Sequence, residues 1–389
     1  MVGVNSEPET MLSTIRIGTS GLLLLLCASA AFAESQDETD ITTPQPGTSI
    51  APDVRGEPSK LKLEKGNFVA VPIPLSDPTL GSGLVAGAGY FYPQTEEQKK
   101  TQPASVTGAG GMYTDNGSYA FGAGHEAFWK NDTWRLVAAA GYADLELELL
   151  APDGTPRGSS VDWDVRGGFA YAALSRKVSG RWYAGLFGRF VDINQDIIIN
   201  LPSRNFDLPA DTKSGGLGVS VAYDSRDMPT NAYEGRLFQA GVLFNEKSFG
   251  SDNSYQSYKL AYRSYHQLQT PVVLAWQVVG CRKSGTVPIW DACRLGLRGF
   301  PATDYMGKSS LMGQFEARWR MSKRWGLVGF AGAGQITKSF SELRDHDIVP
   351  SYGVGVRFSV LPVKRINLRV DYGRSTDSDA VYLSVTEAF

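Results

Sequence analysis

The stretch DAVYLSVTEAF, residues 379–389, ends the chain and alternates in the way a membrane strand does. Val381, Leu383 and Val385 lie on one face of an extended strand, and Phe389 returns to that face. The residues between them are mostly small or polar and lie on the opposite face. Such alternation is expected where lipid covers one face and a hydrated lumen the other. The stretch therefore predicts the closing strand of a transmembrane barrel with Phe389 as its C-terminal barrel signal, although an amphipathic edge strand of a soluble β-protein would share the pattern.

The same alternation recurs upstream, with charged residues on one face. Arg369 and Asp371 alternate with large apolar residues, and Glu316 and Arg318 do the same in an earlier segment. A buried soluble sheet would rarely place charges so regularly, so we expect them to point into a hydrated lumen. Segments of this kind number sixteen, and an even number is what bacterial barrels require. They lie at 68–75, 80–94, 104–114, 117–128, 132–148, 161–175, 180–195, 213–224, 234–247, 254–267, 270–281, 309–320, 324–337, 351–361, 365–373 and 379–389.

The connections between these segments alternate between short and long along most of the chain. Short turns predict one rim, which we expect to face the periplasm, and long connections predict the outward rim. Two interpretations stay open for the first segment, because Pro72 and Pro74 cannot donate ladder hydrogen bonds. It is either an edge strand at the seam of the barrel or a segment outside it. The long connections lie at 149–160, 196–212, 282–308 and 338–350.

The opposite end of the chain carries an export signal. A short apolar core at 21–26 follows Arg16 and precedes the small-residue sequence Ala31-Phe32-Ala33. This core is too short to span a bilayer, and its flanks are those of a cleaved signal peptide. The stretch after it is polar and has no periodicity, which is typical of disorder. The predicted organisation is a signal peptide at 1–33, a disordered periplasmic leader at 34–67 and the barrel at 68–389.

Composition excludes several classes of protein. A net charge of −2 and a pI near 6.0 give no signature of nucleic-acid binding. A mean hydropathy of −0.19 and the lack of a long apolar run exclude helical membrane spans. A transmembrane barrel fits these values, because half of each strand faces water. The predicted fold class is all-β: a 16-stranded antiparallel transmembrane β-barrel of the bacterial outer membrane, in contact with outer-membrane lipid.

Cysteine usage predicts one disulfide. Cys27 lies in the expected signal peptide, which leaves Cys281 and Cys293 with eleven residues between them. In an exported chain this spacing favours a short disulfide loop. The alternative, a metal site, would need His or carboxylate partners, and the nearest histidine, His266, lies fifteen residues before Cys281. We therefore expect a Cys281–Cys293 disulfide, no metal site and no cofactor.

Four motifs, in order along the chain, carry a resemblance to a known family. They are Tyr223-Asp224-Ser225-Arg226-Asp227 with the following Tyr233-Glu234-Gly235, then Leu297-Arg298-Gly299-Phe300, then Gly329-Phe330 leading to Gly334, and the terminal Glu387-Ala388-Phe389. With this order the chain resembles, over roughly 68–389, the BamA/TamA superfamily, the bacterial surface antigen family of outer-membrane assembly and secretion proteins. The POTRA or patatin domains of that family do not fit between Glu34 and Phe68. The resemblance is therefore to the barrel alone.

The resemblance implies a role for the Leu297-Arg298-Gly299-Phe300 motif. In the family this loop folds into the lumen, and its arginine pairs with acidic residues of neighbouring strands. Carried over, the partner of Arg298 is Glu316, whose parity already places it inward. The second acid of the family falls at Gly332, so Glu316 is the minimum that a buried guanidinium demands. The alternative is that Arg298 is a solvated loop residue.

Asp224, Arg226 and Asp227 resemble a metal or acid–base cluster at first sight. In a tight turn with Pro229 and Gly235, however, aspartate side chains more often bond neighbouring backbone amides. We interpret these residues as a structural periplasmic turn, and the resemblance implies no catalysis there.

Three functions stay open. The resemblance implies assembly or transport of protein or lipid at the outer membrane, where a weak seam between the first and last strands helps clients enter the bilayer. The alternative is a structural or surface-interaction barrel whose lumen is plugged by its own loop. A lipid hydrolase would need a base beside a nucleophile, and of His125, His266 and His346 the first points to the opposite face from Glu126. We expect no enzymatic activity and no catalytic residues.

The resemblance also indicates the partners. The barrel assembly machinery would insert the chain, and a periplasmic partner protein would replace the missing POTRA domains.

Overall fold

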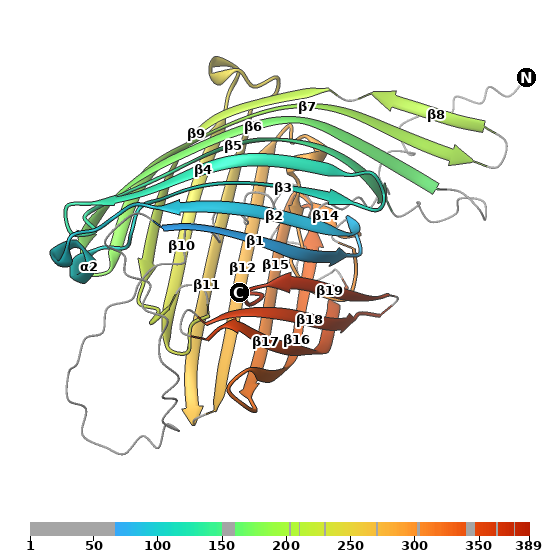
Figure 1. The fold of residues 1–389 in the computed structure, drawn as a ribbon. Coiled ribbons are helices and arrows are strands. Elements are labelled where there is room, and N and C mark those ends of the chain that lie inside the picture. The colour runs from blue at the N-terminus through green and yellow to red at the C-terminus, as the bar shows by residue number, and fades with distance from the viewer. Residues whose placement is uncertain are drawn as a thin grey trace, which may run out of the picture.

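The computed structural model describes residues 67–149, 160–201, 204–209, 211–228, 231–269, 271–301, 304–339, 347–362, 365–376 and 378–389. Its main sheet has 17 strands, of which β8 (Arg204–Pro209) pairs with β7 beside the wall and the other 16 form a closed antiparallel barrel (Figure 1). The barrel strands are β1 (Asn67–Asp77), β2 (Gly81–Phe91), β3 (Val106–Thr114), β4 (Tyr119–Trp129), β5 (Trp134–Leu149), β6 (Ser160–Ser179), β7 (Trp182–Leu201), β9 (Thr212–Asp224), β10 (Gly235–Asn245), β11 (Tyr255–Gln269), β12 (Val272–Gly285), β15 (Ser309–Arg320), β16 (Trp325–Thr337), β17 (Val349–Leu361), β18 (Ile366–Arg374) and β19 (Asp379–Val385).

The predicted all-β architecture, a closed 16-stranded antiparallel barrel, is confirmed, and each of the sixteen expected segments forms a barrel strand. The largest difference is in β7, which continues to Leu201, so that most of the long connection expected at 196–212 is strand, with β8 as its second part. β6 and β7 run for 20 residues each and extend past their neighbours at one end of the barrel (Figure 1). Within the described residues, the helices are α2 (Glu96–Thr101) and two single turns, η1 (Lys247–Phe249) and η2 (Ile289–Asp291). None of the described helices is both long and apolar enough to cross a membrane.

The seam between β1 and β19 closes the barrel. β1 pairs with β2 along its whole length, from Asn67↔Phe91 to Asp77↔Gly81. With β19, the described residues give one pair of Cα partners, Ser76↔Leu383. The expected first segment is therefore an edge strand at the seam, which decides between the two interpretations above.

The prolines of β1 explain why this strand pairs fully with β2 but not with β19. In an antiparallel ladder, alternate residues direct their N–H and C=O groups to the same neighbour. An unbroken ladder with β2 requires that Pro72 and Pro74 direct their backbone edges away from β2 and toward β19, because proline has no N–H to donate. The two prolines thus remove donors from the seam.

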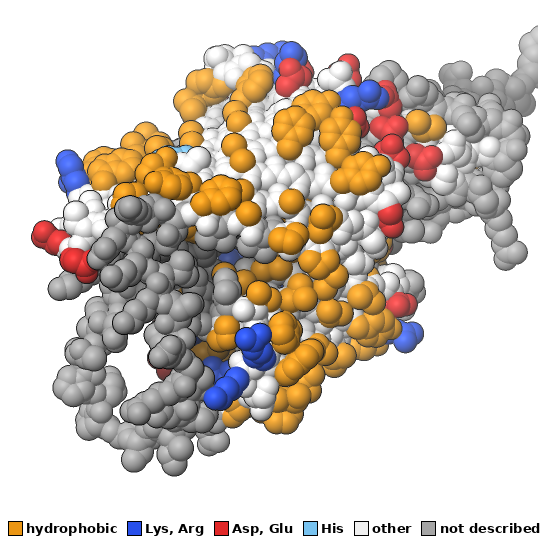
Figure 2. All heavy atoms as spheres, in the orientation of Figure 1, with side chains coloured by type: hydrophobic (Ala, Val, Ile, Leu, Met, Phe, Trp, Pro, Cys, Tyr) orange, Lys and Arg blue, Asp and Glu red, His pale blue; other side chains and the backbone are white. Residues whose placement is uncertain are grey.

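The two faces of the barrel wall differ as the alternation predicts. Large apolar side chains point outward, for example Leu186 and Val354, which are 68% and 63% exposed. Figure 2 shows hydrophobic side chains spread over the wall and charged ones gathered toward the rims. Five of the eight tryptophans mark one rim, which fits a membrane–water interface. They lie at or near the strand ends next to short turns and are Trp129, Trp134, Trp182, Trp319 and Trp325.

We call this end of the barrel the short-turn rim. It consists of the connections β4–β5, β6–β7, β11–β12, β15–β16 and β17–β18, each of four residues or fewer. These are the turns that the sequence predicts to face the periplasm.

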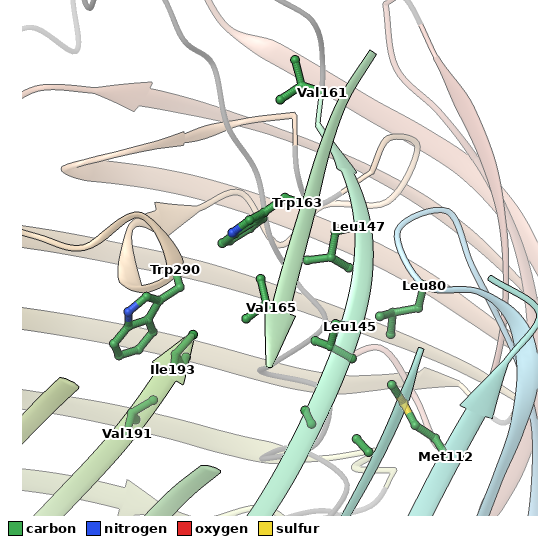
Figure 3. Close-up of a cluster of buried hydrophobic side chains, with 12 residues drawn as sticks. Leu80, Met112, Leu145, Leu147, Val161, Trp163, Val165, Val191, Ile193 and Trp290 are labelled. Carbon is green, nitrogen blue, oxygen red and sulfur yellow. The ribbon is translucent and has the colours of Figure 1, made fainter. Parts of the chain in front are cut away.

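The lumen contains side chains in three apolar clusters. The largest lies between the inner faces of β5, β6 and β7, and Trp290 joins it from the connection between β12 and β15 (Figure 3). The second contains Leu295, Leu297 and Phe300 of the same connection. The third lies between β11, β12 and the chain end. The inside of the barrel is thus packed by its own connections.

The predicted disulfide is present, joining Cys281 in β12 to Cys293 in the following connection, with a Cα–Cα distance of 5.7 Å. The predicted signal peptide and nearly all of the predicted leader lie outside the described residues, as do Pro229 and His346.

Candidate functional site

The connection between β12 and β15 folds inside the barrel. It contains η2, followed by a short hairpin in which β13 (Cys293–Arg294) pairs with β14 (Met306–Gly307). The Leu297-Arg298-Gly299-Phe300 motif lies between the two strands of this hairpin. We call residues 286–301, the described part up to and including the motif, the lumen loop.

Apolar side chains hold the lumen loop in place. Leu295, Leu297 and Phe300 are 1%, 6% and 2% exposed and pack with Met312 on the inner face of β15. Burying a side chain of this size contributes roughly 1.5–3 kcal/mol. The loop is therefore held against the wall by packing as well as by the polar contacts below.

Glycines on the inner face of β16 make room for these leucines. A Cβ atom at Gly332 would lie 2.9 Å from Cδ2 of Leu297 and 2.8 Å from the carbonyl oxygen of Gly313. A Cβ atom at Gly334 would lie 2.7 Å from Cδ2 of Leu295. Separations under about 3 Å are far inside van der Waals contact. The loop can lie flat on β16 because these two positions carry no side chain.

The tip of the lumen loop is bonded to the last strand. Gly299 has a φ of +117° and directs its backbone N–H to the hydroxyl of Tyr382 on β19, at 2.9 Å. The same hydroxyl donates to the carbonyl of Phe300 at 3.0 Å, and Ser378 donates to the carbonyl of Gly299 at 2.9 Å. Only glycine fits here, because a Cβ atom would lie 2.7 Å from the backbone of Arg374. The position of the loop is thus tied to one side of the seam.

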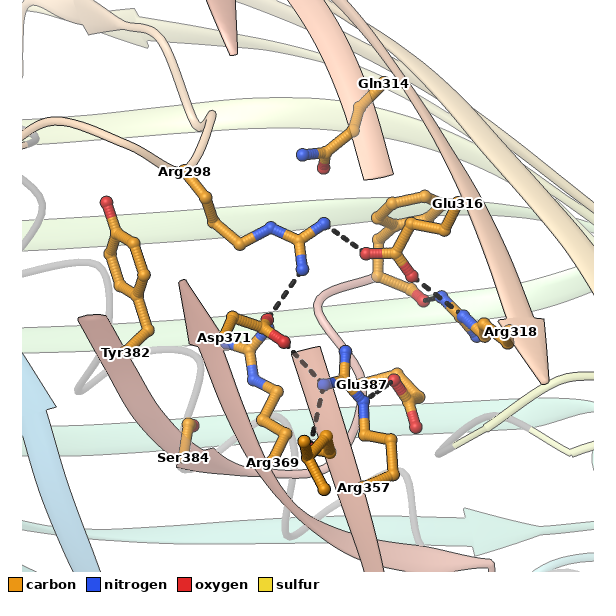
Figure 4. A network of polar contacts seen from close by, with 12 residues as sticks. Arg298, Gln314, Glu316, Arg318, Arg357, Arg369, Asp371, Tyr382, Ser384 and Glu387 are labelled. Atoms are coloured by element: carbon orange, nitrogen blue, oxygen red, sulfur yellow. Dashed lines mark hydrogen bonds and ion pairs between the residues drawn. The ribbon is translucent and has the colours of Figure 1, made fainter. Parts of the chain in front are cut away.

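Arg298 is buried at the centre of a polar network (Figure 4). Its Nη2 donates to Glu316 on β15 and its Nη1 to Asp371 on β18, the latter at 2.6 Å. Its guanidinium carbon lies 3.5 Å from the centre of the Phe330 ring. Arg298 is 6% exposed and both carboxylates are fully buried. A buried guanidinium needs such partners, because an unpaired charge in the interior is strongly destabilising.

Asp371 also binds two other arginines. It accepts hydrogen bonds from Arg357 on β17 and Arg369 on β18. Arg357 in turn donates to Glu387 at 2.7 Å, and Arg318 donates to Glu316 at 2.8 Å. Four guanidinium groups and three carboxylates thus join the lumen loop to β15, β17, β18 and the residues after β19.

The structure changes what the resemblance implied about this anchor. It brings Arg298 to Glu316, the partner expected from parity, and excludes a solvated Arg298. The expectation that Glu316 acts without a second acid is wrong, because Asp371 supplies it from β18. The sequence did contain a signal: Asp371 has inward parity. The family pattern drew attention to Gly332 instead, where the structure shows room for Leu297 and none for a carboxylate.

A second polar anchor, absent from the sequence interpretation, holds the start of the lumen loop. Asp291 accepts from both Nη atoms of Arg189 on β7, at 2.9 and 2.8 Å, and from Tyr255 on β11 at 2.8 Å. Nζ of Lys283 on β12 lies 2.9 Å from the same carboxylate. Burial raises the pKa of Asp291, but the positive charges of Arg189 and Lys283 outweigh it and hold the pKa well below its usual range. The loop therefore spans the lumen between two ionic anchors.

The end of the chain turns into the lumen. β19 ends at Val385, and Thr386 has a φ of 69°, which breaks the alternation. Phe389 lies inside, packed against Tyr265 and Ala275, and its carbonyl oxygen accepts from Arg318 at 2.7 Å. The expectation that Phe389 lies on the lipid-facing side is therefore wrong. Its role as a barrel signal stays a prediction.

The turn between β9 and β10 has the geometry of a structural motif. Asp224 accepts from the backbone N–H and the side chain of Arg226, and Asp227 accepts from the backbone N–H groups of Tyr233 and Glu234. Asp227 also pairs with Arg365 of the β17–β18 turn, so the two turns meet across the mouth of the barrel. All three predicted residues therefore bond neighbouring groups of the chain, which is how we interpreted them.

The described histidines form no constellation that resembles a hydrolase site. Nδ1 of His125 bonds to Thr107 at 2.8 Å on the outer face, whereas Glu126 has inward parity. Nε2 of His266 lies 3.0 Å from the hydroxyl of Ser264, and no carboxylate of the described residues bonds to it. Within the described part of the chain, no group of three or more potential ligands could hold a metal ion.

Comparisons with known proteins show a likeness of fold. No family model and no curated protein matches the sequence. Among solved structures, BamA from Haemophilus ducreyi lacking POTRA domains 1–3 superimposes with a TM-score of 0.55 at 14% identity, over 83% of this chain and 70% of that chain. CdiB from Acinetobacter baumannii gives a TM-score of 0.52 at 12% identity, over 83% of this chain and 60% of that one. CdiB from Escherichia coli gives 0.55 at 12%, over 82% and 62%.

These identities are low, so what is shared is the barrel architecture. This chain spans less than two thirds of the two CdiB chains.

Proposed function

We propose that this chain is an outer-membrane barrel of the BamA and CdiB type that takes part in the assembly or transport of protein or lipid, with the β1–β19 seam as its working site. The apolar outer wall and the tryptophans of the short-turn rim support a membrane location. The likeness to BamA and CdiB supports the class of function at the level of the fold.

The observation that carries the proposal is the weakness of the seam. In lipid, each unsatisfied backbone group costs several kcal/mol, which is why barrels normally close with complete ladders. Here β1 meets β19 at Ser76↔Leu383, whereas it pairs with β2 over all eleven residues. Pro72 and Pro74 reduce the number of donors that an open edge would leave unpaired. The seam is thus the place where the wall opens at least cost.

The filled lumen supports the same conclusion from the opposite direction. The lumen loop crosses the barrel between its two anchors, and the β9–β10 turn contributes Ala232 to a buried cluster beside Phe389. A cargo that crossed through the middle would have to displace both. A route along the seam leaves these contacts in place.

The test is a covalent lock across the seam. Ser76→Cys with Leu383→Cys places two thiols on Cα partners. We expect oxidised cells that depend on this variant to lose folded outer-membrane proteins or surface lipid, and to recover when a reductant is added. The matched control is Ala88→Cys with Ala109→Cys, which places two thiols on Cα partners in the β2–β3 ladder. Both variants keep the native Cys281–Cys293 disulfide, so any effect of the reductant on that bond is the same in the two.

A locked seam that leaves the membrane unchanged would contradict the proposal. That outcome would favour the alternative, a structural or surface-interaction barrel, which the docked lumen loop also suits. If both locked variants fail equally, oxidation rather than seam closure is the cause, and the seam is not the working site.

A further inference from the structure

A cavity lies at the short-turn rim, beneath the ends of β12, β15, β16, β17 and β18. Its volume is about 130 Å³. The wall is strongly basic and contains six cationic side chains, of which two are shared with the network around the lumen loop. They are Arg318, Arg320, Lys323, Arg324, Arg357 and Arg365.

The acidic groups nearby do not balance these cations. Glu387 is the only carboxylate among the described residues that line the cavity, and it accepts from Arg357 and Asn367. Arg365 pairs with Asp227 outside the lining. Within the described part of the chain this leaves three cations without a carboxylate partner. They are Arg320, Lys323 and Arg324.

Two buried guanidinium groups also carry unused donors here. Nη1 of Arg318 and Nη2 of Arg357 are buried and have no hydrogen-bond partner among the described residues, and the two side chains are only 8% and 5% exposed. Buried donors are usually satisfied, so unpaired donors on two arginines whose side chains line a cavity point to a ligand that accepts hydrogen bonds once the guanidinium groups turn toward it. An anion satisfies them and offsets the excess positive charge at the same time.

The other residues that line the cavity indicate where the anion comes from. Trp319, Trp325 and Leu327 belong to its lining and are 49%, 51% and 39% exposed on the outer face of β15 and β16. The cavity therefore borders the lipid side of the wall as well as the mouth of the lumen. Tryptophan prefers the level of lipid headgroups, and guanidinium groups bind phosphate through paired hydrogen bonds.

We propose that this cavity binds the phosphate headgroup of an anionic glycerophospholipid from the adjacent leaflet. The phosphate lies among Arg318, Arg320 and Arg357, and the acyl chains lie along Trp319 and Trp325 outside the barrel. This inference goes beyond the proposed function and does not depend on what passes the seam.

The test measures phospholipid binding to the folded full chain in detergent by native mass spectrometry, with phosphatidylglycerol as the probe. Arg320→Gln with Arg324→Gln removes two cations that the lumen-loop network does not use. We expect phosphatidylglycerol to bind about ten-fold more weakly for each charge-assisted hydrogen bond that is lost. Heat-modifiable electrophoretic mobility checks that the variant folds. If the double variant does not fold, Lys323→Gln, an exposed substitution in the turn, is measured in its place.

The matched control is Arg176→Gln with Arg181→Gln, which makes the same change of charge on the same rim. Arg176 lies 5.5 Å from the ring of Trp134, and Arg181 donates to a carbonyl of the β9–β10 turn, but neither lines the cavity. We expect this control to bind phosphatidylglycerol like the unaltered chain.

Three outcomes would overturn the proposal. Equal weakening in both double variants would mean that rim charge attracts the lipid without a site. Phosphatidylcholine bound as tightly as phosphatidylglycerol would remove the anionic requirement. Displacement of the lipid by millimolar inorganic phosphate, with the phosphate bound at 1:1, would identify a site for a soluble anion.

Discussion

Replacing the two carboxylates that hold Arg298, one at a time and together, tests how the lumen loop is anchored. Glu316→Gln leaves the guanidinium paired with Asp371, and Asp371→Asn leaves it paired with Glu316. Losing one hydrogen bond to a charged group costs about 1.5–3 kcal/mol. Losing both carboxylates leaves the charge of Arg298 buried and unpaired, which costs about 3–5 kcal/mol. We therefore expect each single variant to loosen the loop, and the double variant to release it as fully as Arg298→Ala does.

The assay is protease nicking of the lumen loop in folded barrels, where the cleavage rate follows the population of the open form when reclosing is fast. At about 1.4 kcal/mol for each factor of ten, single variants should be cut about ten- to a hundred-fold faster than the unaltered chain, and the double variant faster still. Lys213→Met is the control, because it breaks an exposed 2.9 Å pair with Asp192 that should contribute less than about 1 kcal/mol.

A single variant that reproduces the whole effect of the double variant would refute this reasoning. If Glu316→Gln were cut like the unaltered chain while Asp371→Asn matched the double variant, one carboxylate alone would hold Arg298. If the double variant stayed resistant, the apolar packing of Leu297 and Phe300 would be sufficient without the ionic anchor.

Three further predictions concern the same loop. Gly332→Ala should loosen it by about 1–3 kcal/mol, because the added Cβ meets Leu297; faster nicking checks this, and slower nicking would contradict it. Reducing Cys281–Cys293 should lower the free energy of unfolding by about 3 kcal/mol by the chain-entropy estimate, measured by urea titration with and without reductant. Because the pKa of Asp291 is depressed in the folded chain, its stabilisation is complete above the unfolded value near 4 and is lost as pH falls below it. Pepsin should then cut the loop faster at lower pH, and Asp291→Asn should flatten that dependence.

The barrel could be predicted from the sequence because its signal is local. An apolar outer face and a polar inner face impose a period of two on every strand, and that period can be counted without knowing which strands are neighbours across the lumen. The inward parity of Glu316 follows from the same count. The ends of β6 and β7 were less accurate, because the alternation is lost there: β7 continues to Leu201 through three consecutive isoleucines at 197–199, and β6 continues to Ser179 through the adjacent cations Arg176 and Lys177.

The site was less predictable because its contacts join distant parts of the chain. Arg298 and Asp371 are 73 residues apart, and parity shows that Asp371 points inward without showing which residue it meets. Asp291 gave no signal in sequence, since its partners come from β7, β11 and β12. The inward turn at Thr386 depends on a single left-handed residue, which alternation cannot detect.

The pairing of Ser76 with Leu383 has a consequence for the order in which this barrel forms. Other neighbouring barrel strands are consecutive along the chain or separated by β8 or the β13–β14 hairpin, so their pairing proceeds locally. The seam joins residues 383 − 76 = 307 positions apart, for which closure costs about 5 kcal/mol of chain entropy. The seam therefore forms after every hairpin is in place, because its two strands are far apart in sequence. It also breaks before any hairpin does, because it contains few paired residues. The barrel is therefore expected to exist transiently as a curled, unclosed sheet both when it is made and whenever its wall is stressed.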